Sequence, residues 1–388
     1  MTRPNRTIVS AFDRLSQEIR SRHDDELFWW GLLGHSFATL LRTNQYSDKE
    51  QLYYLHWFQR WILGSLGPRP VDGKAHYNAT FTHDGSPLEY SVNWREKKIG
   101  RTVRFATEPC SRDSGSASDP FNQRASQALL TAMSKDVPGI DLTRFNTLLA
   151  EIRIPDDEVE QALAKLGDFR SCVLVAYDLE EGTVLPKCYF NPEPKAILTN
   201  TSTEAVAFNA IRKCNGPHGS YDASIKVLNG YWNTLAGPDR PHVFLLANDC
   251  VIDSPSSRLK VYVFAPINTL TKALGHFDLD GALSGEVTAA GLKALRSFWC
   301  HIFGLDSESL DIENEEALPE GSRVAFVYEL RPTTNDQQKV DVVVKMQIPC
   351  SLFGQTDTEI GEKLSTWFHK HGHGDFASRY QIDLASAL

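Results

Sequence analysis

The sequence predicts an α+β fold in which ten antiparallel strands form a β-barrel ringed by helices. The residues before Pro70 have the apolar spacing and the capping residues of helices. After them, strand-like segments come in pairs joined by short turns, with helical segments between the pairs. An antiparallel sheet of this size has two unpaired edges unless it closes, and closure into a barrel removes both.

Two helices are predicted before the first strand. The segment 24–41 begins with acidic residues, which suit a helix N-terminus, and continues with apolar residues at helical spacing. The segment 47–63 has Ser47 at its start and Glu50 three residues later, the pattern of a capping box. The apolar run in the first segment is too short and too polar to span a bilayer, so it is expected to be a buried helix.

Beyond these helices the pattern changes to hairpins. Strands are predicted at 77–82, 87–95, 101–107, 170–178, 183–190, 242–249, 257–264, 322–330, 339–348 and 376–384. Helices are predicted at 119–134, 140–152, 156–167, 203–216, 221–235, 283–302 and 356–370. Doubly wound sheets and (β/α) barrels place a helix after every strand, so neither fits this order. No linker divides the chain, and residues 1–388 are expected to form one domain with a loosely ordered N-terminus at 1–20.

Composition limits the partners and the location of the protein. The net charge of -9 disfavours nucleic acid and anionic membranes, so a site for an anionic ligand has to be local. The seven cysteines are widely spaced and form no CxxC pair, which predicts reduced thiols. The stretch 1–15 has no apolar core of a secretory signal. A cytoplasmic protein is therefore expected.

Polar side chains recur on one face of several predicted strands, because residues two apart in a strand share a face. These sets are Glu89 with Ser91 and Asn93, Thr102 with Arg104, Lys187 with Tyr189, Arg258 with Lys260 and Tyr262, and Lys345 with Gln347. One interpretation is a solvent-exposed face, as in any one-sided antiparallel sheet. The other is that the helices cover the apolar faces from outside and the cations point into the barrel.

The second interpretation implies an anionic ligand, because buried cations need a partner of opposite charge. Diphosphate suits this role, since arginine binds phosphate oxygens bidentately and lysine adds a point charge. Tyrosine beside the cations can donate a hydrogen bond and can present its ring to a carbocation. The pattern thus favours a diphosphate as the ligand.

The segments SPLEYSVNW, KCYFNP and SRLKVYVF together resemble the dimethylallyltryptophan synthase family of indole prenyltransferases. Other segments in the same order, such as FWWGLLGHSFATLL and KMQIPCSLFGQTD, extend the resemblance over about residues 28–380. The family fold is a barrel of repeated αββα units, the ABBA or PT barrel. The resemblance implies metal-independent transfer of a dimethylallyl or geranyl group from its diphosphate to the indole of a tryptophan derivative, in indole alkaloid biosynthesis.

The resemblance also implies roles for single residues. Glu89 would be the catalytic residue and would accept a hydrogen bond from the indole N–H. The diphosphate would be bound by Arg104, Lys187, Arg258, Lys260, Lys345 and Gln347. The allylic cation would be shielded by Tyr189, Tyr262 and Tyr380. Gln347 stands where relatives tend to have tyrosine. The predicted strand 170–178 lacks the lysine that serves as the base in enzymes that alkylate free tryptophan at C4. This second difference favours a modified or cyclised tryptophan as the substrate, such as a cyclic dipeptide or an indolactam.

Alternative functions have weaker support in the sequence. The acidic run 156–160 suits a first helical turn, and the histidine-rich run 369–374 contains two glycines, so no metal site and no cofactor are expected. A phenolic acceptor on the same barrel is less consistent with Glu89, which suits an N–H donor. A non-catalytic barrel that binds a diphosphate or a terpenoid would not need this glutamate. The expected partners are the two substrates and a second copy of the chain as a homodimer, with no nucleic acid and no membrane.

Overall fold

The computed structural model describes residues 10–19, 22–82, 84–94, 101–166, 171–180, 182–307, 311, 313–334 and 340–387. The chain divides into two compact units. The first unit comprises Met1–Pro138, Val173–Pro186 and Ile382–Leu388, and the second comprises Gly139–Cys172 and Lys187–Gln381. Among the described residues, no helix combines the length and the apolar character that a membrane crossing requires.

The described residues contain eight strands, which follow one another in sequence order in one sheet. Their pairings are antiparallel, which confirms the predicted α+β class. The strands are β1 (Leu88–Trp94), β2 (Arg101–Thr107), β3 (Val173–Glu180), β4 (Thr183–Phe190), β5 (His242–Asp249), β6 (Leu259–Pro266), β7 (Arg323–Leu330) and β8 (Val342–Gln347). The predicted number of ten strands is wrong, because the first and the last predicted strands have other structures.

The seven helices predicted in the hairpin region are present with shifted ends, whereas the helices Glu193–Thr199 and Leu270–Asp278 were not predicted. The α-helices are α1 (Ala11–Glu18), α2 (Asp24–Trp29), α3 (His35–Thr43), α4 (Asp48–Trp61), α5 (Arg124–Asp136), α6 (Thr143–Ile152), α7 (Val159–Leu166), α8 (Glu193–Thr199), α9 (Thr203–Arg212), α10 (Asp222–Trp232), α11 (Leu270–Asp278), α12 (Glu286–Phe303), α13 (Asp357–Lys370), α14 (Gly374–Ala377) and α15 (Tyr380–Ala387). The capping box of α4 forms as predicted, with Ser47 and Glu50 bonded to each other's backbone. A π-helical turn, Trp30–Gly34, separates α2 from α3 within the first predicted helix.

The predicted strand 77–82 is irregular because it folds around the buried carboxylate of Glu108. The carboxylate accepts hydrogen bonds from the backbone N–H of Thr80 at 2.8 Å and of Phe81 at 3.4 Å, and from the Tyr77 hydroxyl. Glu108 is 1% exposed, and a buried carboxylate is stable only when it is paired. The N–H groups of Thr80 and Phe81 therefore serve Glu108, and that of Ala79 donates to the Gly85 carbonyl at 3.2 Å, so they do not pair with a neighbouring strand.

The predicted strand 376–384 is helical, and this prediction is also wrong. The segment contributes to α14 and α15, with local hydrogen bonds such as that from the Ser378 N–H to the Gly374 carbonyl at 3.2 Å. The Ser365 hydroxyl of α13 donates to the Ala377 carbonyl and fixes the short connection. Leucine and alanine near the C-terminus favour a helix over a strand.

In the first unit, helices α3 and α4 cover one face of β1, β2 and β3. The ring of Phe105 in β2 lies 5.5 Å from both Phe37 of α3 and Phe58 of α4. Phe37 also stacks on Tyr90 of β1 at 6.0 Å, and Phe105 contacts Tyr177 of β3 at 5.0 Å. The other face of these strands carries the polar side chains, as the alternation predicts.

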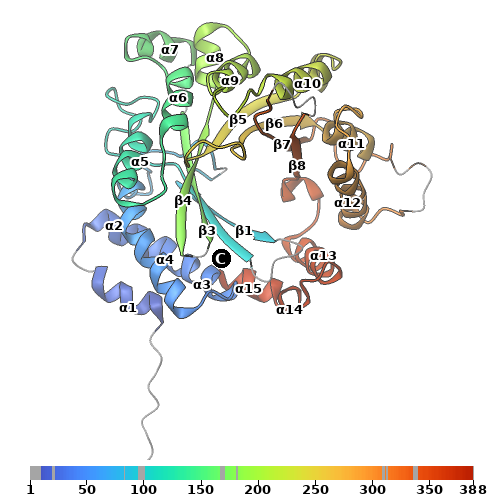
Figure 1. Cartoon of the computed structure of the whole chain (residues 1–388). Coiled ribbons are helices and arrows are strands. Elements are labelled where there is room, and N and C mark those ends of the chain that lie inside the picture. Colours follow the sequence, from blue (N-terminus) through green and yellow to red (C-terminus); the bar gives the residue numbers. More distant parts are fainter. Residues whose placement is uncertain are drawn as a thin grey trace, which may run out of the picture. The chain divides into compact units, whose positions relative to one another are not determined.

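In the second unit, helices cover one face of the strands in the same way (Figure 1). Phe190 of β4 lies 5.6 Å from Phe145 of α6, and Tyr328 of β7 lies 5.9 Å from Trp232 of α10. The Tyr328 hydroxyl donates a hydrogen bond to the His276 carbonyl of α11 at 2.8 Å. Large aromatic side chains therefore join the strands to the surrounding helices.

From Val261 to Pro266, burial alternates along β6 and separates its two faces. Val261 and Val263, on the helix-covered face, are 0% exposed, whereas Tyr262 and Phe264 on the other face are only half-buried. This observation confirms that the helices cover the apolar face of the strand. The face with Lys260 and Tyr262 is therefore the one available to a ligand.

The buried His276 predicts a loss of stability in mildly acidic solution. Its side chain is 4% exposed between Tyr231 and Phe326, and burial lowers its pKa to about 4. The unfolded chain takes up this proton near the ordinary pKa of 6.5, so the stabilisation is complete above that pH and is lost as the pH falls toward 4. We expect the free energy of unfolding to be about 2 kcal/mol lower at pH 5 than at pH 7.5.

Urea unfolding of the wild type and of His276→Phe at the two pH values tests this expectation. Phenylalanine keeps the ring contacts with Tyr231 and Phe326 but does not titrate. The variant should therefore lose this part of the pH dependence. Equal pH dependence in the two proteins would contradict the assignment.

Candidate functional site

Glu89 and Arg104 share the polar face of the strands in the first unit. In the β1–β2 register, Glu89 lies opposite Ala106 and Ser91 lies opposite Arg104, so the two charged residues are diagonal neighbours. Arg104 Nη2 donates to Asp178 Oδ2 of β3 at 3.0 Å. Glu89 is exposed, but partial desolvation of its carboxyl still raises the pKa of this group.

In the second unit, Asp249 at the end of β5 gathers the predicted cations. Arg258 Nε donates to Asp249 Oδ2 at 2.9 Å, and Lys260 Nζ donates to Oδ1 at 3.4 Å. Lys187 of β4 lies opposite Asp249 in the register. Burial by itself would raise the pKa of Asp249, but Lys260, Arg258 and Lys187 outweigh it and the pKa is lowered.

Glu329 of β7 is the second carboxylate of this site. It is 3% exposed and accepts a hydrogen bond from Arg258 Nη1 at 3.0 Å and another from Lys345 Nζ of β8. Burial opposes its ionisation, but Lys345, Arg258 and Lys260 together lower its pKa. We refer to Lys187, Arg258, Lys260, Lys345, Asp249 and Glu329 as the charged cluster.

Lys260 is a buried cation of the charged cluster. It is 6% exposed, and burial lowers the pKa of its amine to about 8. The attraction of Asp249 opposes this shift, whereas the positive charges of Arg258 and Lys187 add to it. A ligand anion would favour the charged form of this lysine.

Tyr189 and Tyr262 lie beside the charged cluster on the same face of the sheet. Each follows a lysine of the cluster by two residues along its strand. Their ring centroids are 5.5 Å apart in an edge-to-face arrangement. Burial raises the pKa of Tyr262, so its hydroxyl stays protonated and can donate a hydrogen bond.

The predicted site residues nearest the C-terminus lie on two different elements, β8 and α15. Lys345 and Gln347 share one face of β8, and both are exposed. Tyr380 begins α15, with its ring 5.5 Å from Phe368 of α13, so its predicted position on a C-terminal strand is wrong. The predicted role of Tyr380 as a cation shield stays a prediction.

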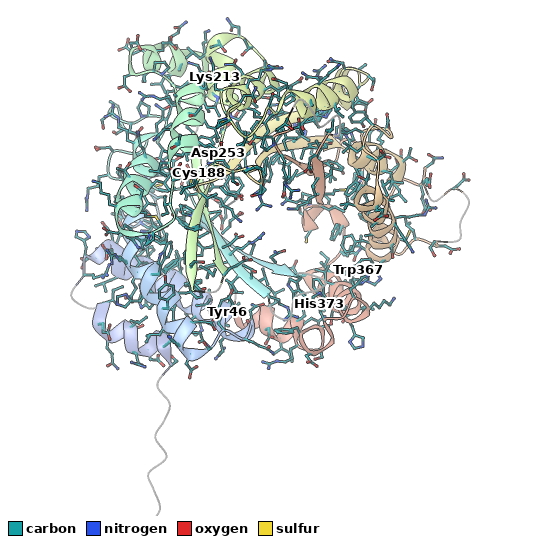
Figure 2. The ribbon with its side chains drawn as sticks, viewed as in Figure 1. Tyr46, Cys188, Lys213, Asp253, Trp367 and His373 are labelled. Atoms are coloured by element: carbon teal, nitrogen blue, oxygen red, sulfur yellow. The ribbon has the colours of Figure 1, made fainter. Side chains whose placement is uncertain are left out.

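The loop that leads into β6 is anchored on the helix side. Arg144 of α6, which is 7% exposed, forms an ion pair with Asp253, a residue labelled in Figure 2. The Asp141 N–H donates to the Cys250 carbonyl at 3.0 Å. These bonds hold the chain on both sides of Val251 and restrict where Arg258 enters the charged cluster.

Sequence reasoning missed the two carboxylates of the charged cluster. Asp249 is the only acidic residue of β5 and Glu329 is the only one of β7, and both strands are otherwise largely apolar. A single acidic residue in such a strand is a usable signal, because it is buried only when paired. The register then gives the partner, since Glu329 lies opposite Lys260.

The charged cluster contains two more cations than carboxylates and has tyrosine rings beside it. Surplus positive charge suits an anionic group, and phosphate oxygens match arginine and lysine donors. The adjacent ring faces suit an apolar or cationic group. The face can therefore hold an anionic head and stabilise positive charge that develops next to it.

Known proteins are similar to this chain in sequence and in fold. The sequence profile of the family described as tryptophan dimethylallyltransferase matches residues 25–382. Prenyltransferase iacE of Pestalotiopsis fici is 43% identical over 380 residues, which cover 96% of this chain and 86% of that protein. Indole diterpene prenyltransferase anaPT of Neosartorya fischeri is 27% identical over 365 residues, covering 93% of this chain and 79% of that protein.

Solved structures agree with the sequence matches. The crystal structure of AnaPT superimposes with a TM-score of 0.80 and 25% identity, and covers 97% of this chain and 88% of that one. The crystal structure of NotF with brevianamide F and DMSPP has the same fold, with a TM-score of 0.78, 23% identity and coverage of 96% and 89%. This chain belongs to the tryptophan dimethylallyltransferase family and is an aromatic prenyltransferase.

Proposed function

We propose that the enzyme transfers a dimethylallyl group from its diphosphate to the indole ring of a tryptophan-derived compound. The observation that carries this proposal is the surplus positive charge of the charged cluster beside Tyr189 and Tyr262. The relatives add support, because anaPT is named an indole diterpene prenyltransferase and NotF was crystallised with brevianamide F and DMSPP.

The charged cluster binds the diphosphate in this proposal and stabilises it as it leaves. The allylic C–O bond breaks and its electron pair departs with the diphosphate, whose growing charge meets cations that are already in place. The carboxylates Asp249 and Glu329 hold Arg258 in the free enzyme, so the guanidinium does not have to be ordered at the moment of reaction. Arg104 and Gln347 are assigned to the same diphosphate.

The allylic cation then reacts with the indole ring. The rings of Tyr189 and Tyr262 offer their faces to the cation and keep water from it. A ring carbon forms the new C–C bond, and the ring proton passes to an oxygen of the released diphosphate, which restores aromaticity. Glu89 accepts a hydrogen bond from the indole N–H and so orients the ring. Its carboxyl has to be ionised for this role.

Further features belong to the same proposal. Fixed cations do the work that a metal would do at the leaving group, so the reaction proceeds without Mg²⁺. The proposal also includes a homodimeric state. The proposed location is the cytosol, where free thiols such as those of the seven cysteines stay reduced.

Product mass tests the proposed reaction. The purified protein would be incubated with dimethylallyl diphosphate and a panel of tryptophan, tryptophan-containing cyclic dipeptides and indolactams, with and without EDTA. A product heavier by one isoprenoid unit, formed equally in EDTA, is the expected result. Transfer to phenols but not to indoles would contradict the proposed acceptor, and loss of product in EDTA would contradict the metal-free reaction.

The lowered pKa of Lys260 predicts that the enzyme binds diphosphate less well in alkaline solution. The lysine loses its charge as the pH rises through about 8, whereas Lys260→Arg keeps a positive charge at this position. We expect the dissociation constant of inorganic diphosphate, taken relative to that of Lys260→Arg, to rise about tenfold from pH 7 to pH 9. Calorimetric titration of both proteins cancels the ionisation of the ligand itself, and a constant ratio would contradict the prediction.

A further inference from the structure

A bulge in β5 changes which side chains face the ligand side of the sheet. Val243 pairs with Val263 and Leu245 pairs with Tyr262, so Phe244 is an extra residue between two adjacent pairs of the β5–β6 ladder. Val243 and Val263 are at most 1% exposed on the helix-covered face. Because Phe244 is the extra residue, its side chain can join the face of Tyr262.

The ring contacts show that it does so. Phe244 stacks on Phe264 with ring centroids 4.0 Å apart and an interplanar angle of 18°. It also meets the edge of Tyr262 at 6.1 Å. Phe264 and Tyr262 share the ligand-side face of β6, so Phe244 lies on that face as well.

The stacked pair lies at a defined distance from the charged cluster. Residues two apart in a strand are about 6.6 Å apart, so Tyr262 stands about 7 Å and Phe264 about 13 Å along β6 from Lys260. On the neighbouring strand, the residues opposite these positions are Val327 and Ala325, which are small. Bulk at the far end of the face therefore comes from β5 and β6, where the Phe244–Phe264 pair lies beside the exposed His242.

Packing alone does not account for this pair. The valines on the helix-covered face of the same strands are almost completely buried, whereas Phe244 and Phe264 are half-buried. A stacked aromatic pair that only filled the interior would be covered by other side chains. Half-exposed apolar rings in line with a cation cluster are typical of a site for a ligand with a charged head and an apolar tail.

We propose that the Phe244–Phe264 pair limits the prenyl chain of the donor to one isoprene unit. This inference rests on the proposed function, in which the diphosphate occupies the charged cluster. A dimethylallyl chain that starts at the cluster ends near Tyr262. The second isoprene unit of a geranyl chain extends further along β6 and meets the stacked rings, so the enzyme selects the shorter donor.

The experiment compares kcat/KM for geranyl and dimethylallyl diphosphate in the wild type, Phe264→Ala and the milder Phe264→Leu. Opening the space should raise the geranyl-to-dimethylallyl ratio at least about tenfold in Phe264→Ala, the lower end of what one apolar group contributes to specificity. Phe264→Leu should raise it less. Val263→Ala, on the opposite face of the same strand, is the matched control and should leave the ratio unchanged.

Calorimetric binding of the two donors as non-reacting thiolodiphosphates provides a readout that does not need turnover. An unchanged donor ratio in both Phe264 variants, or an equal rise in Val263→Ala, would overturn the inference. If the wild type transfers neither prenyl group, the proposed function fails. The binding ratio of the variants then still decides whether the stacked pair limits the chain.

Discussion

Replacing Arg258 with methionine is expected to lower kcat/KM for prenyl transfer by about a thousandfold, the loss typical of removing one preorganised charge-stabilising donor. Arg258 donates to Asp249 at 2.9 Å and to Glu329 at 3.0 Å. The variant therefore removes a cation from the leaving group and also leaves two carboxylates with less compensation. Both effects oppose the negative charge that builds on the diphosphate. Steady-state kinetics with the best acceptor of the panel would measure the loss.

Two further variants separate this role from a general effect of charge. Arg258→Lys keeps the charge but cannot bridge both carboxylates in the same geometry, so its activity should be intermediate. Arg212→Met removes an arginine of the second unit whose ion pair with Asp222 is about half-exposed at the surface, and should leave kcat/KM unchanged. Full activity of Arg258→Met in a protein with an unchanged melting temperature would refute the proposed role.

Glu89→Gln is expected to lower kcat about a hundredfold, the loss that a small misplacement of the reacting ring can cause, while diphosphate binding is retained. Glutamine keeps the size of the side chain but accepts the indole N–H through a neutral oxygen. The raised pKa of Glu89 also predicts that activity falls, as the pH is lowered, at a pH above the ordinary value of 4.5, because protonation removes the acceptor. The pH–rate profile and inorganic diphosphate titration measure both effects.

Ser91→Ala is the matched control for this position, since Ser91 is exposed on the same face of β1 two residues away. It should retain activity and the acid limb of the profile. An unchanged rate in Glu89→Gln would remove the residue from the proposed mechanism. Loss of diphosphate binding in Glu89→Gln would show that the carboxylate maintains the structure of the site and does not act on the indole substrate.

The sequence was sufficient to predict which side chains share a face, because a strand alternates strictly with a period of two. Lys187 with Tyr189, and Lys260 with Tyr262, lie together for this reason. It was also sufficient for the described α-helices of ten residues or more, whose apolar residues repeat at helical spacing and whose capping residues are local, but not for shorter helices such as α8 and α11. These predictions depend only on neighbours a few residues apart.

Features set by distant residues were beyond the same reasoning. The segment 77–82 follows Glu108, and the charged cluster depends on Asp249 and Glu329, which the chain brings together across strands. Strict alternation counted back from Asp249 would place Phe244 on the helix-covered face, but the bulge in the β5–β6 ladder reverses this. A single inserted residue thus changes the face of a side chain without a sequence signal.

The two faces of the strands in the second unit have different consequences for the evolution of the enzyme. Residues against the helices, such as Val261 and Val263, are fully buried. Replacing them with smaller residues leaves a cavity and lowers the free energy of unfolding. Tyr262 and Phe264 project from the other face and are only half-buried, so exchanging them removes fewer packing contacts. Substitutions on this face therefore cost little folding stability, and they can accumulate even though most proteins are only marginally stable. New donor and acceptor preferences can arise in such a lineage by successive single mutations, each of which leaves a folded enzyme.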